Sequence, residues 1–446
     1  MLLDQLDVLK SSGLLTASAL LEWEGQTPEP VTGFVPRAPE SLEQAGVPLH
    51  LIESLVLKLL LNRGTASGRE IASQLCLPFR VLDEFLRQLK KDQLVAHRCS
   101  APMQDYVYEL TSAGHERGTR HLEQTSYSGA TPVSHGEWVK SVEKQSLQSQ
   151  SPNRDDLRRA LGDLVFPERL LRQVGQAVTA AKAMFLYGLP GNGKTSIAQK
   201  ICSAFGKHIW IPRALVYDGE IVRLFDPIVH RPAPAKDDPS VDPRWIRIVR
   251  PTVIAGGELT LEQLELTVVG RSNIVEAPLQ MKSNCGLLVI DDFGRQRCSP
   301  AELLNRSIVP LETGFDYLNL PSGKKICVPF EQMIVFSTNL APRDLVDEAF
   351  LRRIPYKIEA PNPTEEEFRR IFNAMAEKLG IPFDPATYDE MVRRHFRDAG
   401  RGFRCCHPRD LLQQIKTFCK FENRPAEMTR ETMEAAVENY FVNLDR

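Results

Sequence analysis

Residues 183–196 read AMFLYGLPGNGKTS, and this stretch decides the fold of the chain around it. The apolar run 184–187 predicts a buried β-strand, a glycine-rich turn follows it, and an amphipathic helix follows the turn. Glycines let such a turn point its backbone N–H groups inward at phosphate oxygens, and the helix N-terminus adds partial positive charge. A strand, a phosphate-binding turn and a helix in this order predict an α/β fold with a nucleotide site.

The turn offers the groups that a magnesium nucleotide needs. Lys194 is placed to reach the β- and γ-phosphates, and the hydroxyl of Thr195 is placed to bind Mg²⁺. We expect further contacts with the nucleotide from the turn and the start of the helix, namely Gly188, Pro190, Gly191, Asn192, Gly193 and Ser196. The predicted cofactors are therefore ATP and Mg²⁺.

A second buried strand, GLLVIDD at 286–292, ends in two acids. We expect it to neighbour the strand before the glycine-rich turn, because parallel strands place their carboxyl ends at one edge of a sheet. Asp291 would then hold the Mg²⁺ water shell. Asp292 would orient and deprotonate the attacking water.

With these motifs, residues 154–446 resemble the AAA+ ATPases. The resemblance implies a core over 154–361, in which helices sandwich a parallel five-stranded sheet, and a helical lid over 362–446. That family usually has Asp-Glu where this chain has Asp291-Asp292. The shorter carboxylate would sit about one methylene farther from the water, which predicts slow or partner-stimulated hydrolysis.

Four further residues match the family pattern. Asn339, at the end of MIVFSTN, would be a sensor that helps to position the water, and either Arg352 or Arg353 would be an arginine finger reaching a neighbouring subunit. Arg409, at the start of a lid helix, would touch the nucleotide. The ordinary alternatives are a strand end, solvated surface charge and a structural salt bridge. The resemblance also implies a homo-oligomeric ring.

Two insertions enlarge the core, one at about 213–280 and one a β-hairpin at 317–330. The hairpin precedes the strand of Asn339 and so resembles the clade that includes MoxR-type and magnesium-chelatase ATPases. Members of that clade commonly form rings that remodel proteins or move nucleic acid. Tyr217 follows the expected second core strand and is either a residue that grips a substrate or an ordinary loop tyrosine.

The N-terminal third, residues 1–153, differs from the rest of the chain in composition and in the elements that it predicts. Residues 1–47 predict one or two short helices and a Pro-rich connector, and residues 123–153 are polar and predict a linker. Between them, 48–122 resembles a winged helix, with the helix at 79–91 in the recognition position. Residues 47–122 hold 10 Lys and Arg against 8 Asp and Glu, a weak surplus for DNA. A protein client is therefore favoured, and a DNA-binding, ATP-switched regulator or replication-type loader remains the alternative.

Composition sets the remaining expectations. The chain has 446 residues and a net charge of -2, so it has no global basic field for nucleic acid. Nine scattered cysteines indicate a reduced, cytoplasmic protein, and the most apolar stretch, 51–61, is too short to span a membrane. Cys405, Cys406 and His407 suggest either a metal site or buried thiols, and the second is favoured because adjacent cysteines point apart.

Overall fold

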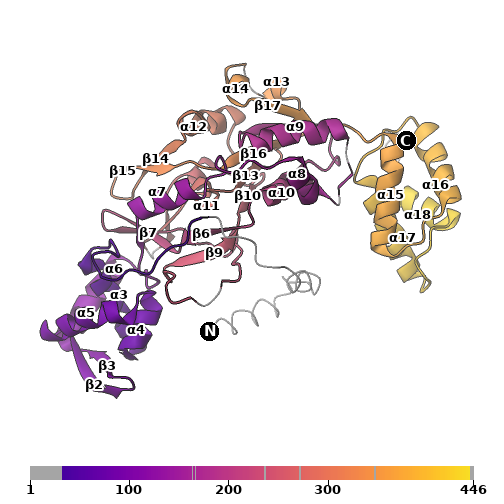
Figure 1. Ribbon diagram of the computed structural model, residues 1–446. Coiled ribbons are helices and arrows are strands. Elements are labelled where there is room, and N and C mark those ends of the chain that lie inside the picture. Colours follow the sequence, from indigo (N-terminus) through magenta and orange to yellow (C-terminus); the bar gives the residue numbers. More distant parts are fainter. Residues whose placement is uncertain are drawn as a thin grey trace. The chain divides into compact units, whose positions relative to one another are not determined.

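The computed structural model describes residues 33–441, apart from 163, 166, 236–237, 271–272 and 346–347. Figure 1 shows the order of the helices and strands along the described part of the chain. The N-terminal helix expected within residues 1–25 lies outside the described residues. Among the helices that are described, none combines the length and apolar character needed to cross a bilayer.

Five parallel strands form the central sheet, in the order β10-β13-β16-β5-β17. Alternate residues of the strands face two separate hydrophobic clusters, so helices cover both faces, as apolar parallel strands require. This confirms the predicted α/β core. The strands are β5 (Met184–Tyr187), β10 (Thr252–Ala255), β13 (Leu287–Ile290), β16 (Met333–Thr338) and β17 (Tyr356–Glu359).

Two helical layers flank this sheet. One layer packs against the face that carries Met184 and Leu186, and the other packs against the face that carries Phe185. The first consists of α8 (Arg154–Leu161), α9 (Glu168–Thr179) and α10 (Lys194–Ile201). The second includes α12 (Pro300–Thr313), α13 (Pro342–Leu345) and α14 (Glu348–Arg353).

The strand order corrects two expectations. The strand that ends in Asp291 is not the neighbour of β5, because β16 lies between them. The second core strand is β10, and not the strand before Tyr217, because the latter belongs to the insertion. In both cases the strand order depends on pairing with a segment that is distant in the sequence. Hydrophobic periodicity along the sequence does not specify such pairings.

The insertion builds its own sheets. A mixed five-stranded sheet has the order β11-β12-β8-β7-β4, in which β4 (Val133–Ser134) comes from the segment before the core, and β6 pairs antiparallel with β9. The strands are β6 (His208–Pro212), β7 (Ala214–Tyr217), β8 (Glu220–Arg223), β9 (Trp245–Val249), β11 (Thr267–Val269) and β12 (Ile274–Glu276). The short helices of this region are η1 (Cys202–Ala204), η2 (Leu261–Leu264) and α11 (Leu279–Lys282).

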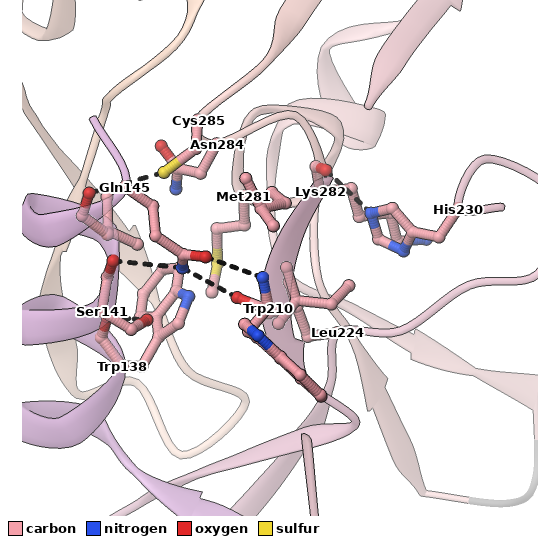
Figure 2. Close-up of a pocket in the computed structure, with 13 residues that line it drawn as sticks. Trp138, Ser141, Gln145, Trp210, Leu224, His230, Met281, Lys282, Asn284 and Cys285 are labelled. Carbon is pink, nitrogen blue, oxygen red and sulfur yellow. Dashed lines mark hydrogen bonds between the residues drawn. The ribbon is translucent and has the colours of Figure 1, made fainter. Parts of the chain in front are cut away.

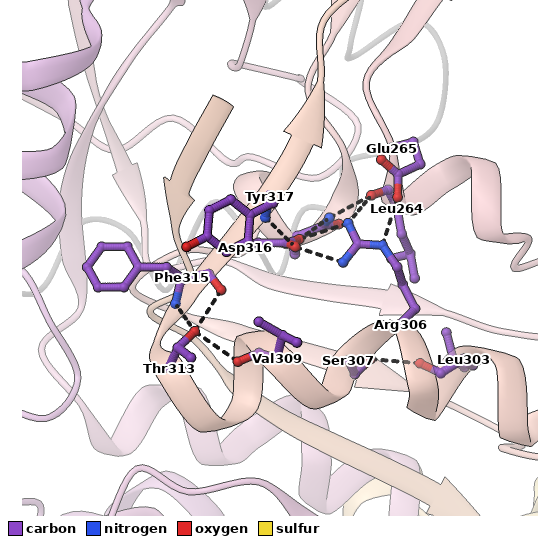
Figure 3. Close-up of polar contacts among 11 residues, drawn as sticks. Leu264, Glu265, Leu303, Arg306, Ser307, Val309, Thr313, Phe315, Asp316 and Tyr317 are labelled. Carbon is purple, nitrogen blue, oxygen red and sulfur yellow. Dashed lines mark hydrogen bonds and ion pairs between the residues drawn. The ribbon is translucent and has the colours of Figure 1, made fainter. Parts of the chain in front are cut away.

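The predicted hairpin consists of β14 (Phe315–Asn319) and β15 (Lys325–Pro329). Its base is held by Arg306 of α12, which donates to the two carboxylate oxygens of buried Asp316 at 2.7 and 3.0 Å (Figure 3). The same guanidinium donates to Glu265 at 2.7 Å, in the segment that follows η2. The hairpin is therefore anchored to both the core and the insertion.

Residues 49–124 form helices and a three-stranded antiparallel sheet of order β1-β3-β2. Their hydrophobic core continues into the insertion, because Ala214, Val216 and Ile221 of β7 and β8 belong to the same cluster. The elements are α3 (Leu49–Arg63), β1 (Thr65–Ser67), α4 (Gly68–Leu75), α5 (Phe79–Lys91), β2 (Val95–Ala101), β3 (Asp105–Leu110) and α6 (Ser112–Gln124).

The segment expected to be a linker is part of the core. It contains β4 (Val133–Ser134), which pairs with β7, and α7 (His135–Lys144), whose Trp138 and Val142 are buried. After α7, the Gln145 side chain accepts a hydrogen bond from the N–H of Trp210 at 2.7 Å and donates to its carbonyl at 2.9 Å (Figure 2). The prediction of a linker was wrong. The segment has few aliphatic residues, but the buried side chain of Trp138 supplies the packing that they would otherwise provide.

The C-terminal helices form a separate hydrophobic cluster. A capping box begins the first helix, since Thr364 and Glu367 hydrogen-bond each other's backbone N–H, and Gly380 ends it in a left-handed conformation. The helices are α15 (Glu365–Leu379), α16 (Pro385–Val392), the π-helical turn η4 (Arg393–Arg397), α17 (His407–Phe421) and α18 (Arg430–Tyr440).

Replacing Trp138 with alanine tests the role of α7. Because this indole is 2% exposed, we expect Trp138→Ala to lower the free energy of unfolding by about 3–5 kcal/mol in urea denaturation. Glu143→Ala, an exposed position on the same helix, should change it by less than about 0.5 kcal/mol. Equal stabilities of the two variants would mean that 123–153 behaves as a linker.

Candidate functional site

The glycine-rich turn leaves β5 with a backbone that only glycine accommodates well. Gly188 has φ 140°, and a Cβ there would lie 2.5 Å from the carbonyl oxygen of Ala360. Gly191 has φ 84°, and a Cβ there would lie 2.5 Å from Sγ of Cys406. Gly193, with φ 78°, begins α10. All three glycines have positive φ, and at Gly188 and Gly191 close neighbours also leave no room for a Cβ.

Lys194 is buried at the first position of α10. Its Nζ donates to the carbonyls of Gly188 at 2.9 Å and Leu189 at 3.1 Å, and to Oδ1 of Asn339 at 2.7 Å. Burial lowers the pKa of Lys194, while the negative charges of Asp291 and Asp292 act in the opposite direction. The lysine therefore connects the glycine-rich turn to the end of β16.

The two acids meet different partners. The hydroxyl of Thr195 donates to Oδ2 of Asp291 at 2.9 Å, with Oδ1 at 3.2 Å. The side-chain amide of Asn339 donates to Oδ1 of Asp292 at 3.2 Å. The structure thus brings together Lys194 and these four side chains, although they come from three segments of the chain.

Three other residues predicted for the turn contribute differently. Pro190 and Ser196 are exposed. The Asn192 side chain is buried and donates to Ala360 O at 3.3 Å and to Asn362 Oδ1 at 2.9 Å. Because the Asn192 side-chain amide is already engaged, only the backbone N–H of this residue could donate to a phosphate.

The donor set fits a magnesium-bound polyphosphate. Thr195 and Asp291 bring a hydroxyl and a carboxylate together, and oxygen ligands are those that Mg²⁺ prefers. Among the described residues, no group of three or more His, Cys, Asp or Glu side chains could hold a metal ion. Magnesium here would therefore take its remaining ligands from phosphate and water. The N-terminus of α10 and Lys194 would supply positive charge for the phosphates.

The two arginines before β17 differ in their surroundings. Arg352 is exposed at the end of α14. Arg353 is half-buried, and its Nε donates to Oε1 of Glu312 on α12 at 2.6 Å. Of the pair, Arg352 has the side chain that solvent reaches more freely.

Two arginines near the start of α17 differ in their surroundings: Arg409, which the sequence suggested, and Arg404. Arg409 is exposed and bonds Asp410, at 2.9 Å. Arg404 lies closer to the glycine-rich turn: its guanidinium donates to Asn362, and its positive charge contributes to the lowered pKa of Lys194. The Cys406 N–H donates to the Gly191 carbonyl at 2.9 Å. Sequence reasoning missed Arg404 because it precedes α17 and matches no helical pattern.

The two candidate sites considered above, at residues 405–407 and at Tyr217, consist of buried or half-buried side chains. The His407 ring lies 5.5 Å from Phe396, centroid to centroid, and burial lowers its pKa to about 4. Burial raises the pKa of the neighbouring Cys405 thiol to about 11. Tyr217 is buried against α7 and the hairpin, with a raised pKa for the same reason. A buried Tyr217 is not positioned to grip a substrate, whereas Asp218 beside it pairs with Lys324 of the hairpin.

Comparison with known proteins adds a match to one family. Residues 364–439, most of the lid, match a domain of unknown function (DUF8689). No curated protein sequence matches the chain. The family model covers much less than half of the chain, so the match leaves the core unassigned.

Part of the chain is similar to solved structures. A point mutant of RuvB from Thermotoga maritima is 15% identical, with a TM-score of 0.38; the match covers 63% of this chain and 72% of that one. NtrX from Brucella abortus in complex with ATP is 13% identical, with a TM-score of 0.40; the match covers 65% of this chain and 60% of that one. Likeness at this level carries no argument about activity.

Proposed function

We propose that this chain is an AAA+ ATPase, which binds and hydrolyses Mg·ATP and works as an oligomer that remodels a protein or protein complex. One observation carries the proposal. Lys194, Thr195, Asp291, Asp292 and Asn339 converge at the carboxyl edge of the parallel sheet, where open α/β folds bind ligands.

Each side chain has a role that its contacts support. Lys194 would exchange its two carbonyl partners for phosphate oxygens. Thr195 and Asp291 would hold Mg²⁺, which neutralises charge on the transferred phosphoryl group. Asp292 would accept the proton of the attacking water, and Asn339 would orient that water. Because Asp292 is one methylene shorter than the glutamate usual in the family, slow turnover is expected.

Two substitutions separate binding from hydrolysis. We expect Lys194→Ala to weaken ATP binding about 10–100-fold in calorimetry, because charged hydrogen bonds to phosphate contribute about 1.5–3 kcal/mol. Asp292→Asn should keep the affinity and lower phosphate release about 100-fold or more, because a general base contributes that much. In the same titration Arg404→Ala should weaken binding more than Arg409→Ala. Equal phosphate release by the wild type, Lys194→Ala and Asp292→Asn would remove the enzyme proposal.

The exposed Arg352 supports a finger that acts on a neighbouring subunit. A site completed by a second copy needs an arginine that solvent reaches, and Arg353 is already engaged by Glu312 within its own chain. This makes Arg352 the better candidate of the two.

Mixing subunits tests this assignment. Arg352→Ala should lower turnover by about 10³-fold or more, since such fingers contribute that much. Mixing Arg352→Ala subunits with Lys194→Ala subunits should restore turnover. The Lys194→Ala subunit keeps its Arg352, which can reach the intact site of a neighbouring Arg352→Ala subunit. Arg353→Ala serves as the matched control and should show a smaller loss. A protein that stays monomeric with a non-hydrolysable ATP analogue would contradict a finger in trans.

We further propose that residues 48–122 form a winged helix that docks a protein and not duplex DNA. Charges near the expected recognition face are partly neutralised: Arg87 pairs with Asp83 at 2.8 Å, and Arg98 lies 3.9 Å from Glu109. DNA-binding modules carry an uncompensated basic surplus for phosphates. The core shared with β7 and β8 would transmit force from the ATPase to a docked protein.

A salt titration of the full chain on random duplex DNA distinguishes the two partners. Binding through 6–10 phosphate contacts would strengthen by about 10³–10⁵-fold between roughly 200 and 50 mM salt. We expect no such rise. Steep salt-dependent binding that is lost in Lys91→Glu, an exposed position on α5, would favour the DNA-binding regulator instead.

A further inference from the structure

We propose that Gln296 is a positioning residue that sets the direction of the Asp292 carboxylate. The inference rests on the proposed ATPase function, in which Asp292 is the base. Sequence patterns gave no reason to select Gln296, which lies in the irregular segment between β13 and α12.

The side chain of Gln296 closes the turn that follows β13. Its Nε2 donates to the carbonyl oxygens of Asp291 at 2.8 Å and Asp292 at 3.2 Å. It also lies 3.4 Å from the carbonyl oxygen of Gly256, in the loop after β10. Its Oε1 accepts from the N–H of Gly294 at 2.8 Å. One amide group thus binds the backbone on both sides of Phe293 and reaches the neighbouring strand's loop.

This turn holds Asp292 in a conformation that an L-residue avoids. Its φ is 49°, in the left-handed region. The next residue is secured from the other side, since the N–H of Phe293 donates to Ser337 O at 2.7 Å and the Thr338 hydroxyl donates to Phe293 O at 2.9 Å. These bonds to β16 on one side and to Gln296 on the other keep Asp292 from returning to an ordinary negative φ.

The direction of the carboxylate follows from this backbone. An aspartate has one methylene, so the backbone and χ1 alone fix the position of its carboxylate carbon, whereas in a glutamate χ2 can also change that position. Asp292 points its Oδ1 toward Asn339 Nδ2, at 3.2 Å. Gln296 therefore matters here because a short base depends on an accurately placed turn.

Steady-state kinetics test the assignment. We expect Gln296→Ala to lower kcat about 10–100-fold, the cost of a small misplacement, with ATP affinity changed less than about twofold. Gln296→Glu keeps the size but cannot donate to the three carbonyls, so it should lose a similar factor. Arg297→Ala, an exposed side chain in the same loop, is the control and should keep the wild-type kcat.

A double-mutant cycle distinguishes positioning from a general structural effect. If Gln296 acts through Asp292, Gln296→Ala should cost nothing further in an Asp292→Asn background. An unchanged kcat, or the same fold loss in both backgrounds, would overturn the inference. A crystal structure of Gln296→Ala gives a readout without turnover: a retained left-handed Asp292 aimed at Asn339 would also overturn it. A wild-type protein that neither binds nor hydrolyses ATP would instead refute the proposed function.

Discussion

The amide of Asn339 is the link on which the candidate site depends. Its oxygen accepts from Lys194 and its nitrogen donates to Asp292, so one side chain at the end of β16 joins the glycine-rich turn to the acidic turn. These two turns leave strands that are not neighbours. A second link joins the same two turns directly, because the Thr195 hydroxyl donates to Asp291.

Strand β7 has a similar connecting role elsewhere in the chain, because it packs against two hydrophobic clusters. Strand β7 presents Ala214 and Val216 to the core of the N-terminal helices, and Leu215 and Tyr217 to the core of α7 and the hairpin. Because successive side chains of β7 point to opposite faces, this one strand joins the N-terminal helices, α7 and the hairpin. Arg306 extends the connection, because it binds the base of the hairpin from α12. Arg306 and β7 therefore link α12, the hairpin and residues 49–124 through direct contacts.

Charge and backbone conformation act together at the acidic turn. Asp291 is satisfied by the Thr195 hydroxyl, whereas Asp292 depends on a left-handed turn for its direction. Left-handed residues other than glycine persist where the surroundings hold them, and they concentrate at functional sites. In the proposed mechanism Asp291 would hold the metal and Asp292 would accept the proton, and Gln296, which donates to both backbone carbonyls, would maintain this difference.

The sequence by itself determined the nature of the core and most of the candidate groups, because these follow from local requirements. A buried strand before Gly188, a helix after Gly193 and two acids after an apolar run are readable from spacing alone. Tertiary structure decided which residues meet. The strand order, the burial of Trp138, the approach of Arg404 and the bonds of Gln296 all depend on contacts between distant segments. No local periodicity encodes such contacts, because they arise only when separate strands and loops pack against one another.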